Sequence, residues 1–469
     1  MQQRKKGDHL SMPVVRRIDF GEFGSVMPAF AGMTRSLFLH YSYRSELLVL
    51  ITALILNVFG NRLTWAEPKP GEFLNQKNWQ EAKGLIPDAI LQRFQDGGYE
   101  AKVITLPNTL AWGSKFKSAS ETNAGKFAID EEDSLIAVDT KAYPTFLYGH
   151  PFPQIDPHDP QAAAKVIYNF SYTLMQADDA DRFSKLSWVQ PTAFERDAEF
   201  QGQLLFYGSR FSGPIPNEDA ALRKGIIAGF SPTDIYGVVT LEWVYLDPKR
   251  WNSLWAYVPE FRRVRSVPAF GGSESLFGSE LAHDDPYLFS GKVQYFTWKL
   301  IGAQDALVPY TLPNPKTLQQ GDKGYLLGDS QDPLIMGWEK EGWERKAWWP
   351  TNYNLVKRPV WVIEATAKDS QYAYGRQILW IDRELYIAYY KEAYNRAGQL
   401  WRMLLNSVSV ARTSGGDFSV AQPDFTLSVN ELQNNATVEQ PFKQGQPLAF
   451  GVGLSSEHFT TNDILKRGR

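Results

Sequence analysis

The sequence predicts an α+β protein made mainly of antiparallel sheet, and three observations lead to this prediction. From Thr192 onward, short segments alternate apolar and polar residues with the period of two that half-buried strands show. Short turns join these segments, as in an antiparallel meander. The regular alternation of strand and helix that builds a parallel nucleotide-binding sheet does not occur in the sequence. We therefore expect one continuous antiparallel sheet with few helices.

Helical spacing of apolar residues occurs in two segments. The first segment, 75–94, is interrupted by the break Gly84 to Pro87, and the second is 162–175. Between them, residues 99–106 have the composition of a strand. Each helix can cover one face of the sheet, or it can lie on the surface.

Strands are expected in two groups joined by a long irregular segment. The segment, 303–358, is rich in Pro, Gly, Asp, Gln and Trp, and we expect it to be an inserted loop or lid. After Gly415 the chain becomes polar, and only residues 445–454 indicate a last strand. Asn395 to Gly398 is a hairpin turn with Gly where positive φ is needed. The expected strands are 199–207, 238–246, 253–258, 262–267, 359–367, 374–382, 385–394 and 399–411.

The first 66 residues are expected to lie outside the mature fold. Residues 47–59 form an apolar run with the length of a signal-peptide core, shorter than the roughly 20 residues of a membrane-spanning helix. Met33 begins a short basic leader, and the residues before it resemble translated intergenic DNA. We expect cleavage near Ala66, export across the inner membrane, and a single domain at 67–469. An uncleaved N-terminal anchor is the alternative.

Composition excludes several classes of function. The chain of 469 residues has no Cys, which excludes disulfides, thiolate metal sites and cysteine nucleophiles. A formal net charge of −3 gives no basic footprint for a nucleic acid. With 22% charged and 43% hydrophobic residues, a large core is possible.

Catalytic signatures are missing from the sequence. We find no Gly-x-Ser-x-Gly, His-Glu-x-x-His or glycine-rich phosphate-binding pattern. His150 and His283 are isolated from each other, and the acidic pair that follows His283 is more simply a solvated loop than a metal site. We therefore expect no catalytic residue, no metal and no cofactor.

Aromatic content is the first feature that indicates a function. Aromatic residues make up 14% of the chain, 15 of them Trp, and they gather on the expected strands. On the open face of a curved sheet they would line a cavity for an apolar ligand, because buried apolar area stabilises binding by about 25 cal/mol per Å². A densely packed core without a cavity is the alternative. The candidate cavity residues are Trp243, Trp255, Tyr257, Trp298, Trp361, Trp380, Tyr389 and Trp401.

Three arginines in the expected strand 262–267 are the second feature. Alternation places Arg263 and Arg265 on one face of the strand and Arg262 on the other. Their guanidinium groups can bind an anionic partner or a lipid head group. Alternatively, they keep a solvated edge strand soluble.

Several strings resemble a bacterial family, domain-of-unknown-function family 1329, which is described as similar to outer-membrane lipoprotein-sorting proteins. They are Gly84–Tyr99, Leu254–Arg265, Phe277–Leu281 with Asp285, and Val360–Asp382, and the resemblance covers nearly all of the chain after the leader. It implies a fold like LolA and LolB, a strongly curved, incomplete antiparallel β-barrel capped by helices. Proteins of that fold carry lipid or lipoprotein acyl chains through the periplasm. The long segment 303–358 departs from the smaller carriers.

The resemblance also implies partners, since genes of this family tend to lie beside those of resistance-nodulation-division-type exporters and outer-membrane proteins. Our first hypothesis is a periplasmic carrier of lipid or another hydrophobe that works with an envelope export or sorting system and performs no covalent chemistry. The second is a structural or adaptor component of an envelope transporter complex. The third, an envelope hydrolase, requires His150 or His283 to lie near a Ser and an Asp in one cleft.

Overall fold

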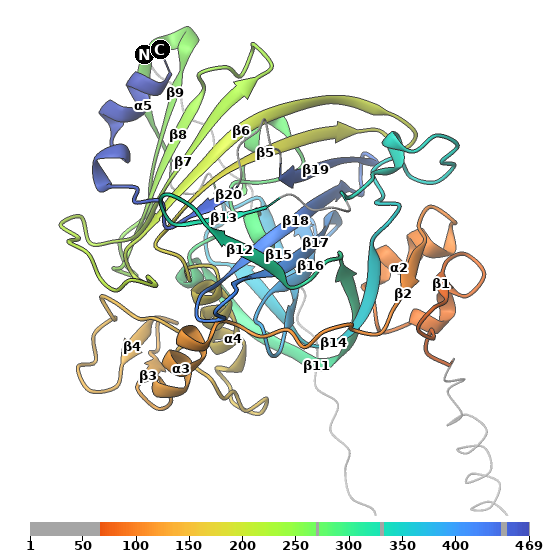
Figure 1. Ribbon diagram of the computed structural model, residues 1–469, viewed down its shortest axis with the longest axis horizontal. Helices are drawn as coiled ribbons and strands as arrows, with labels where there is room; N and C mark the ends of the chain where they lie inside the picture. The colour runs from red at the N-terminus through yellow and green to blue at the C-terminus, as the bar shows by residue number, and fades with distance from the viewer. Residues whose placement is uncertain (1–65, 269–271, 329–332, 442–447, 469) are drawn as a thin grey trace, which may run out of the picture. The chain divides into compact units, whose positions relative to one another are not determined.

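An 18-stranded sheet dominates the computed structural model of the chain (Figure 1). The structure describes residues 66–268, 272–328, 333–441 and 448–468, so the expected leader, apart from Ala66, lies outside the described residues. Within these ranges, no helix has both the length and the apolar character needed to cross a membrane.

The elements follow one another in the order of the chain. The strands are β1 (Phe73–Leu74), β2 (Ala101–Val103), β3 (Phe127–Ile129), β4 (Leu135–Ala137), β5 (Asp179–Val189), β6 (Phe194–Phe206), β7 (Ala221–Ser231), β8 (Val239–Tyr245), β9 (Ser253–Val258), β10 (Arg263–Val267), β11 (Phe296–Tyr310), β12 (Lys316–Gln320), β13 (Tyr325–Leu327), β14 (Asn354–Ala367), β15 (Tyr374–Asp382), β16 (Ala388–Asn395), β17 (Leu400–Thr413), β18 (Ser419–Asn430), β19 (Asn435–Pro441) and β20 (Leu448–Phe450). The α-helices are α2 (Asp88–Gln95), α3 (Ser114–Thr122), α4 (Ala162–Thr173) and α5 (Thr461–Arg467). Short 3-10 helices are η1 (Trp79–Ala82), η2 (Pro259–Phe261), η4 (Leu276–Gly278), η5 (Pro286–Leu288), η6 (Val293–Tyr295), η7 (Gly337–Glu339) and η8 (Ser456–His458).

Thirteen strands form an antiparallel run, and no further strand among the described residues extends it at either end. Their order in space is β10-β9-β8-β7-β6-β5-β19-β18-β17-β16-β15-β14-β11. The short strands β12, β13 and β20 connect β17 to β5 across the curve, and β2 adds to β14. The predicted fold class is thereby confirmed: α+β, mainly antiparallel, with a strongly curved sheet that remains incomplete.

The local predictions that rest on turns and helical spacing are confirmed. Asn395 to Gly398 closes the hairpin between β16 and β17, with Gly398 at φ +79° and its N–H donating to the Asn395 carbonyl. The first helical segment is η1 followed by α2, with the break at Gly84, where φ is +78°. The second helical segment is α4.

The expected insertion at 303–358 is wrong at both ends. Residues 303–310 belong to β11 and 354–358 to β14, and these two strands pair from Phe296–Ala367 to Tyr310–Asn354. Exposed polar residues such as Gln304 and Asp305 on the edge strand hide the alternation there. The middle of the segment is packed, because Trp348 and Trp349 are fully buried. No described residue of 303–358 lines the cavity described below, so the segment does not form the expected lid over it.

The polar stretch after Gly415 is also more regular than expected. It contains two long strands, β18 and β19, in the centre of the sheet. Most polar side chains of β18 are buried, and many of them are hydrogen-bonded; the Ser419 hydroxyl, for example, donates to Gln176 and accepts from the Gly113 N–H. A strand with both faces covered does not show the polar–apolar alternation of a half-exposed one.

Buried side chains cover both faces of the curved sheet. One apolar cluster contains Phe200 of β6, Phe170 of α4 and Ile363 of β14, so strands from distant parts of the sheet share an enclosed interior. A second cluster packs β14 to β19 against α2 and the segment around Trp348. The third lies on the opposite, outer face of β6 to β9, where Phe459 and Ile464 at α5 cover it. The strands β6 and β7 thus have an apolar cluster on each face.

Candidate binding cavity

A cavity of about 470 Å³ lies within the curve of the sheet, between β5–β9, α4 and the loop 272–295. Its size lies within the range of about 300–1,000 Å³ that small-molecule pockets show. Most of the lining is apolar or aromatic. The apolar and aromatic lining residues include Leu135, Tyr168, Tyr172, Leu174, Met175, Phe200, Leu204, Phe206, Leu222, Ile227, Val244, Leu254, Leu276, Phe289 and Val293.

Small residues on the inner face of the strands create the space. In β6, Gly202 stands between the inward-facing Phe200 and Leu204, and it pairs with Ile227 of β7. A Cβ at Gly202 would meet only Arg182, with its Nε at 3.7 Å. Gly225 of β7 also lines the cavity, and the side chain of Leu204 packs over it, since a Cβ there would come to 3.1 Å from Leu204 Cδ2. Gly202 thus leaves room beside Arg182, and Gly225 lets Leu204 lie flat against the sheet.

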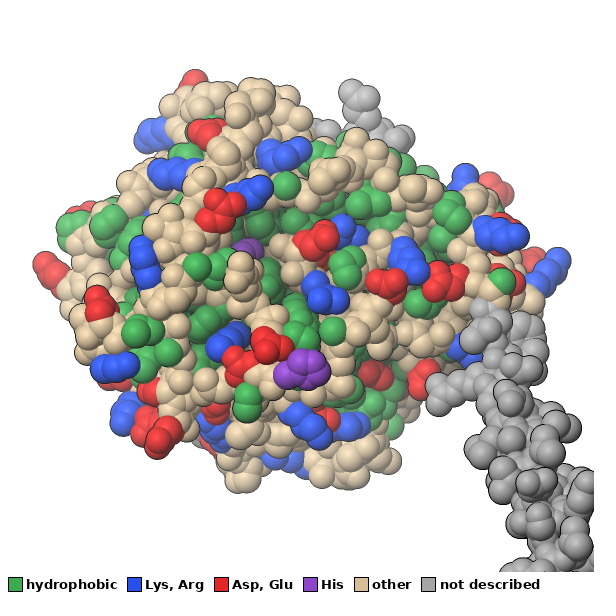
Figure 2. Space-filling model, turned by 90° about the horizontal axis from the view of Figure 1, so that it is seen from below, with side chains coloured by type: hydrophobic (Ala, Val, Ile, Leu, Met, Phe, Trp, Pro, Cys, Tyr) green, Lys and Arg blue, Asp and Glu red, His purple; other side chains and the backbone are tan. Residues whose placement is uncertain are grey.

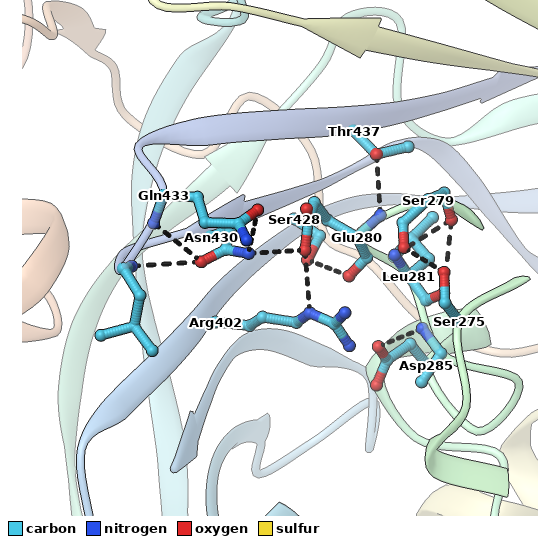
Figure 3. Close-up of polar contacts among 12 residues, drawn as sticks. Ser275, Ser279, Glu280, Leu281, Asp285, Arg402, Ser428, Asn430, Gln433 and Thr437 are labelled. Atoms are coloured by element: carbon cyan, nitrogen blue, oxygen red, sulfur yellow. Dashed lines mark hydrogen bonds and ion pairs between the residues drawn. The ribbon is translucent and has the colours of Figure 1, made fainter. Parts of the chain in front are cut away.

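The loop 272–295 fills the other part of the enclosed space, and Figure 3 shows how it is attached. The carboxylate of Glu280 lies 3.2 Å from Arg402 Nε and accepts from the Asn430 amide. Its backbone N–H donates to Thr437 Oγ1, and its carbonyl accepts from Ser428. The loop is thus bound to β17, β18 and β19.

A buried ion pair fixes the same loop more deeply. Asp285 and Lys391 are both fully buried, with 2.6 Å between Oδ1 and Nζ. The other carboxylate oxygen of Asp285 accepts from the Tyr374 hydroxyl and the Ala282 N–H, at 2.9 and 2.7 Å. A buried charge is tolerated when such partners satisfy it, and the removal of one partner is strongly destabilising. This network positions the loop that forms one wall of the cavity.

Ionisable groups with shifted pKa values lie in the cavity wall next to this network. Burial raises the pKa of Asp284 to about 6, and the charge of Glu242 adds to the effect, although Tyr372 donates a hydrogen bond of 2.9 Å to the carboxylate. Burial lowers the pKa of Lys292 to about 8. Its ammonium group donates to the carbonyls of Asp247 and Arg250, each at 2.6 Å.

Two arginines face the cavity with different partners. Arg223 forms an ion pair of 3.0 Å with Glu242 and donates to the Ser290 carbonyl. Arg182 donates one hydrogen bond of 3.0 Å to the Tyr287 hydroxyl, and no carboxylate of the described chain lies within 4.0 Å of it. One cavity cation is thus neutralised locally and the other is not.

The hairpin of β3 and β4 lies at the mouth of the cavity. Its turn forms ion pairs with two different parts of the rim, Glu132 with Lys249 at 3.2 Å and Asp133 with Lys368 at 3.0 Å. Tyr143 and Trp251, 38% and 51% exposed, also belong to the lining. On the face that Figure 2 shows, hydrophobic side chains are visible in hollows between charged ones.

The eight aromatic residues predicted from the sequence are not among the residues that line this cavity. Trp243, Trp255 and Tyr257 belong to the outer cluster beneath α5. The residues next to them in sequence explain this, since Glu242 and Leu254 face the cavity. Successive side chains of a strand point to opposite faces of the sheet, so the aromatic residues point to the outer face. Trp298, Trp361 and Trp401 pack in or against the inner core away from the cavity, and Trp380 and Tyr389 belong to the second core cluster. Any binding role for these eight residues stays a prediction.

The three predicted arginines lie on the surface. Arg263 and Arg265 are exposed in β10, which pairs only with β9 within the described chain and is therefore an edge strand there. Arg262 does not occupy the opposite face of this strand; it lies in the preceding turn with φ +48°. Arg265 packs over the ring of Phe261 at 4.5 Å. Their role in binding a partner stays a prediction.

The two histidines considered for hydrolysis are not placed for it. The Nε2 of His150 lies 2.8 Å from Thr173 Oγ1, and burial lowers its pKa to about 3. Burial also lowers the pKa of His283, which lines the cavity. Neither ring has a hydrogen bond to both a Ser and an Asp among the residues that the structure describes. In those same residues, no group of three or more His, Asp or Glu has the arrangement of a metal site.

Sequence reasoning missed the residues that do line the cavity. The alternation of Phe200, Gly202 and Leu204 was visible in the sequence, and glycines at inward positions of adjacent strands are the signal that could have located the space. The contribution of loop 272–295 has no local sequence signal, because it depends on contacts such as that between Glu280 and Arg402, 122 positions apart.

Fold and cavity together define an open, curved β-sheet protein with an internal cavity. Residues 73–464 match the family described as "Protein of unknown function (DUF1329)", and because the match spans most of the sequence, the chain belongs to this family. The family predicted from the strings around Leu254–Arg265 is thereby confirmed. A search of curated proteins found no match.

Comparison with solved structures gave remote likenesses. One is a proposed outer membrane lipoprotein-sorting protein domain from Vibrio parahaemolyticus, with 15% identity, TM-score 0.45, and coverage of 66% of this chain and 100% of that one. A family protein from Desulfovibrio piger has 15% identity, TM-score 0.44, and coverage of 65% and 99%. A LolA superfamily protein from Nitrosomonas europaea has 12% identity, TM-score 0.38, and coverage of 64% and 97%. At these values no function is transferred to this chain.

Proposed function

We propose that the protein is a carrier that binds one lipid or other hydrophobic molecule in its cavity and performs no covalent chemistry. The observation that carries this proposal is the space of about 470 Å³ enclosed by the sheet, α4 and the loop 272–295. Its lining is mainly apolar, with charged groups such as Arg182, Arg223 and Lys292 among the apolar ones, and such a mixture is usual for a small-molecule site. The volume suits a single chain-like ligand.

The energetics of such binding make it reversible and selective for length. Each buried methylene contributes about 0.8 kcal/mol, so each one added to a ligand should strengthen binding about fourfold until the cavity is full. Loss of free motion on association offsets part of this gain. Transfer between donor and acceptor then requires only a difference in affinity, since a ligand moves toward the state that binds it more tightly.

The proposed location is the periplasm. It is supported by the apolar run at 47–59 and the small residues before Glu67, which suit export and cleavage. In that compartment the carrier would work with an envelope export or sorting system, and a resistance-nodulation-division-type transporter and an outer-membrane protein are the proposed partners.

A matched pair of tryptophan variants tests the proposal. Gly202→Trp places an indole in the cavity, whereas Gln201→Trp places one on the outer face of the same strand, where Gln201 contacts Asp181. We expect the first to weaken binding of a fluorescent apolar probe at least tenfold and the second to leave it unchanged. Equal binding by both variants, with normal circular dichroism, would contradict the proposal.

An adaptor role is the second candidate function. It is favoured by the exposure of Arg262, Arg263 and Arg265 at the edge of the sheet, where none of them has an ion-pair partner among the described residues. If this role is primary, Arg262→Ala/Arg263→Ala should abolish co-purification of an envelope membrane complex while Gly202→Trp does not. The reverse pattern would favour the carrier.

A further inference from the structure

We propose that the ligand is an amphiphile with one acidic head group, a carboxylate or a phosphate, which binds Arg182 inside the cavity while its apolar chain extends across the inner face of β6 to β9. This inference rests on the proposed carrier function and names the chemical class of its ligand.

The geometry around Arg182 leaves its guanidinium group accessible from the cavity. Arg182 is in β5 and pairs in register with Gly202 of β6. Because Gly202 has no side chain, the position beside the Arg182 Nε, where a Cβ would come to 3.7 Å, remains open. The Tyr287 ring lies 5.1 Å from the guanidinium carbon on another side, and its hydroxyl accepts one hydrogen bond. Several N–H donors of the guanidinium group are therefore available for a ligand.

Five Lys or Arg side chains line the cavity, and of these Arg182 and Lys292 have no ion-pair partner among the described residues. Arg182 has the fewer hydrogen bonds of these two. Arg223 is paired with Glu242, and the Lys292 ammonium donates to two carbonyls. Arg182 has no carboxylate within 4.0 Å in the described part of the chain. Burial alone would lower its pKa, but Tyr287 and the charge of Glu439, which also lines the cavity, outweigh burial and raise it. A cation in an apolar wall gains from an anion that binds it, and the guanidinium group suits the two oxygens of a carboxylate or phosphate.

Mostly apolar residues continue from Arg182 in the direction of the next strands. The residues paired across the sheet from Gly202 are Ile227 of β7 and then Thr240 of β8. The adjacent row runs from Leu204 to Leu254 and includes Glu242, whose charge is paired with Arg223. Four strand spacings of about 4.8 Å give a path of about 19 Å from β5 to β9. An extended acyl chain can therefore lie along this wall with its acidic end at Arg182.

A set of ligands that differ only in the head group tests this inference on the full mature chain. The ligands are oleate, oleyl alcohol and oleoyl lysophosphatidate, with inorganic phosphate as the head group without a chain. We expect wild type to bind at least one of the two acids about tenfold or more tightly than the alcohol, because a hydrogen bond to a charged group is one of the stronger polar contacts. The tighter acid identifies the head group.

Two methionine variants separate a specific role of Arg182 from a general effect of charge. Arg182→Met should abolish the preference for the acid and keep the affinity for oleyl alcohol within about twofold. Lys185→Met removes a positive charge from the outer face of the same strand and should keep the preference. Arg182→Lys should restore part of the preference, and Glu439→Gln should increase it by weakening the competing negative charge.

The outcomes distinguish failure of this inference from failure of the carrier proposal. If wild type binds the acids and the alcohol equally, or if Arg182→Met weakens all of them equally, the inference is overturned while the carrier function remains. Displacement of bound oleate by millimolar inorganic phosphate would also overturn it, since the site would then be one for a free anion. If no chain-bearing ligand binds, the carrier proposal itself fails.

Discussion

Asp284 shows at the scale of a residue how the cavity perturbs a charge. Its pKa is raised from 3.8 to about 6 because the carboxyl group is buried and Glu242 adds negative charge. Between these two pH values the unfolded chain loses this proton while the folded chain keeps it. The free energy of unfolding therefore decreases as pH rises through this window, by about 3 kcal/mol in all, and the loss is complete above pH 6.

Replacing the carboxyl group at position 284 by an amide should remove this decrease in the free energy of unfolding with rising pH. Asp284→Asn keeps an oxygen that can accept the hydrogen bond from Tyr372. We expect it to stabilise the folded chain by about 1–3 kcal/mol at pH 7 and by almost nothing near pH 4, measured by urea unfolding at both pH values. A gain of the same size at both pH values would show that the carboxyl group is not the cause.

At the scale of an element, the contacts at α5 should contribute to the stability of the fold and not to ligand affinity. Phe459, just before this helix, is fully buried on the outer face of β6 to β9, and its carbonyl accepts from Trp243 Nε1. Phe459→Ala should lower the free energy of unfolding by about 3–5 kcal/mol, as large-to-small core changes do. Affinity for an apolar ligand should be unchanged below the unfolding transition, because the cavity lies on the other face of the sheet. The control is Phe230→Ala, at a residue 42% exposed, which should change stability by less than about 0.5 kcal/mol.

The hairpin of β3 and β4 should control the rate of ligand exchange. Its ion pairs at the mouth, Glu132–Lys249 and Asp133–Lys368, are exposed, and such pairs contribute about 0–1 kcal/mol each and weaken with salt. We expect stopped-flow dissociation rates to rise several-fold between low and high salt, and Lys368→Ala to give the faster rate already at low salt. A rate independent of both salt and this substitution would show that the hairpin does not limit exchange.

Elements were predictable from the sequence where a local signal exists. The hairpin at Asn395 to Gly398, the helix α4 and the strand around Phe200 follow from turn chemistry and periodicity. The strands β18 and β19 were missed because buried hydrogen bonds satisfy their polar side chains, as in the bond from Ser428 to the Glu280 carbonyl. No composition rule distinguishes such a strand from a solvated loop.

For the whole molecule, the fold class was predictable and the position of the cavity was not. The alternation of apolar and polar residues along a strand shows that its two faces differ, but it does not show which face the curved sheet encloses. Trp243 and Trp255 were assigned to a cavity because of their chemistry, whereas the structure places them under α5, on the outer face of the sheet. The cavity is located by Gly202 and Gly225 and by a loop attached from far along the chain.

The central claim is that the interior of the curved sheet holds a hydrophobic ligand, and native mass spectrometry of the chain from Glu67 onward tests it most directly. The protein would be purified without detergent and sprayed alongside Gly202→Trp. We predict that wild type carries the added mass of one amphiphile per chain, or acquires it on titration with lipid, and that the variant does not. A bare polypeptide mass for wild type, unchanged at saturating lipid, would contradict the account.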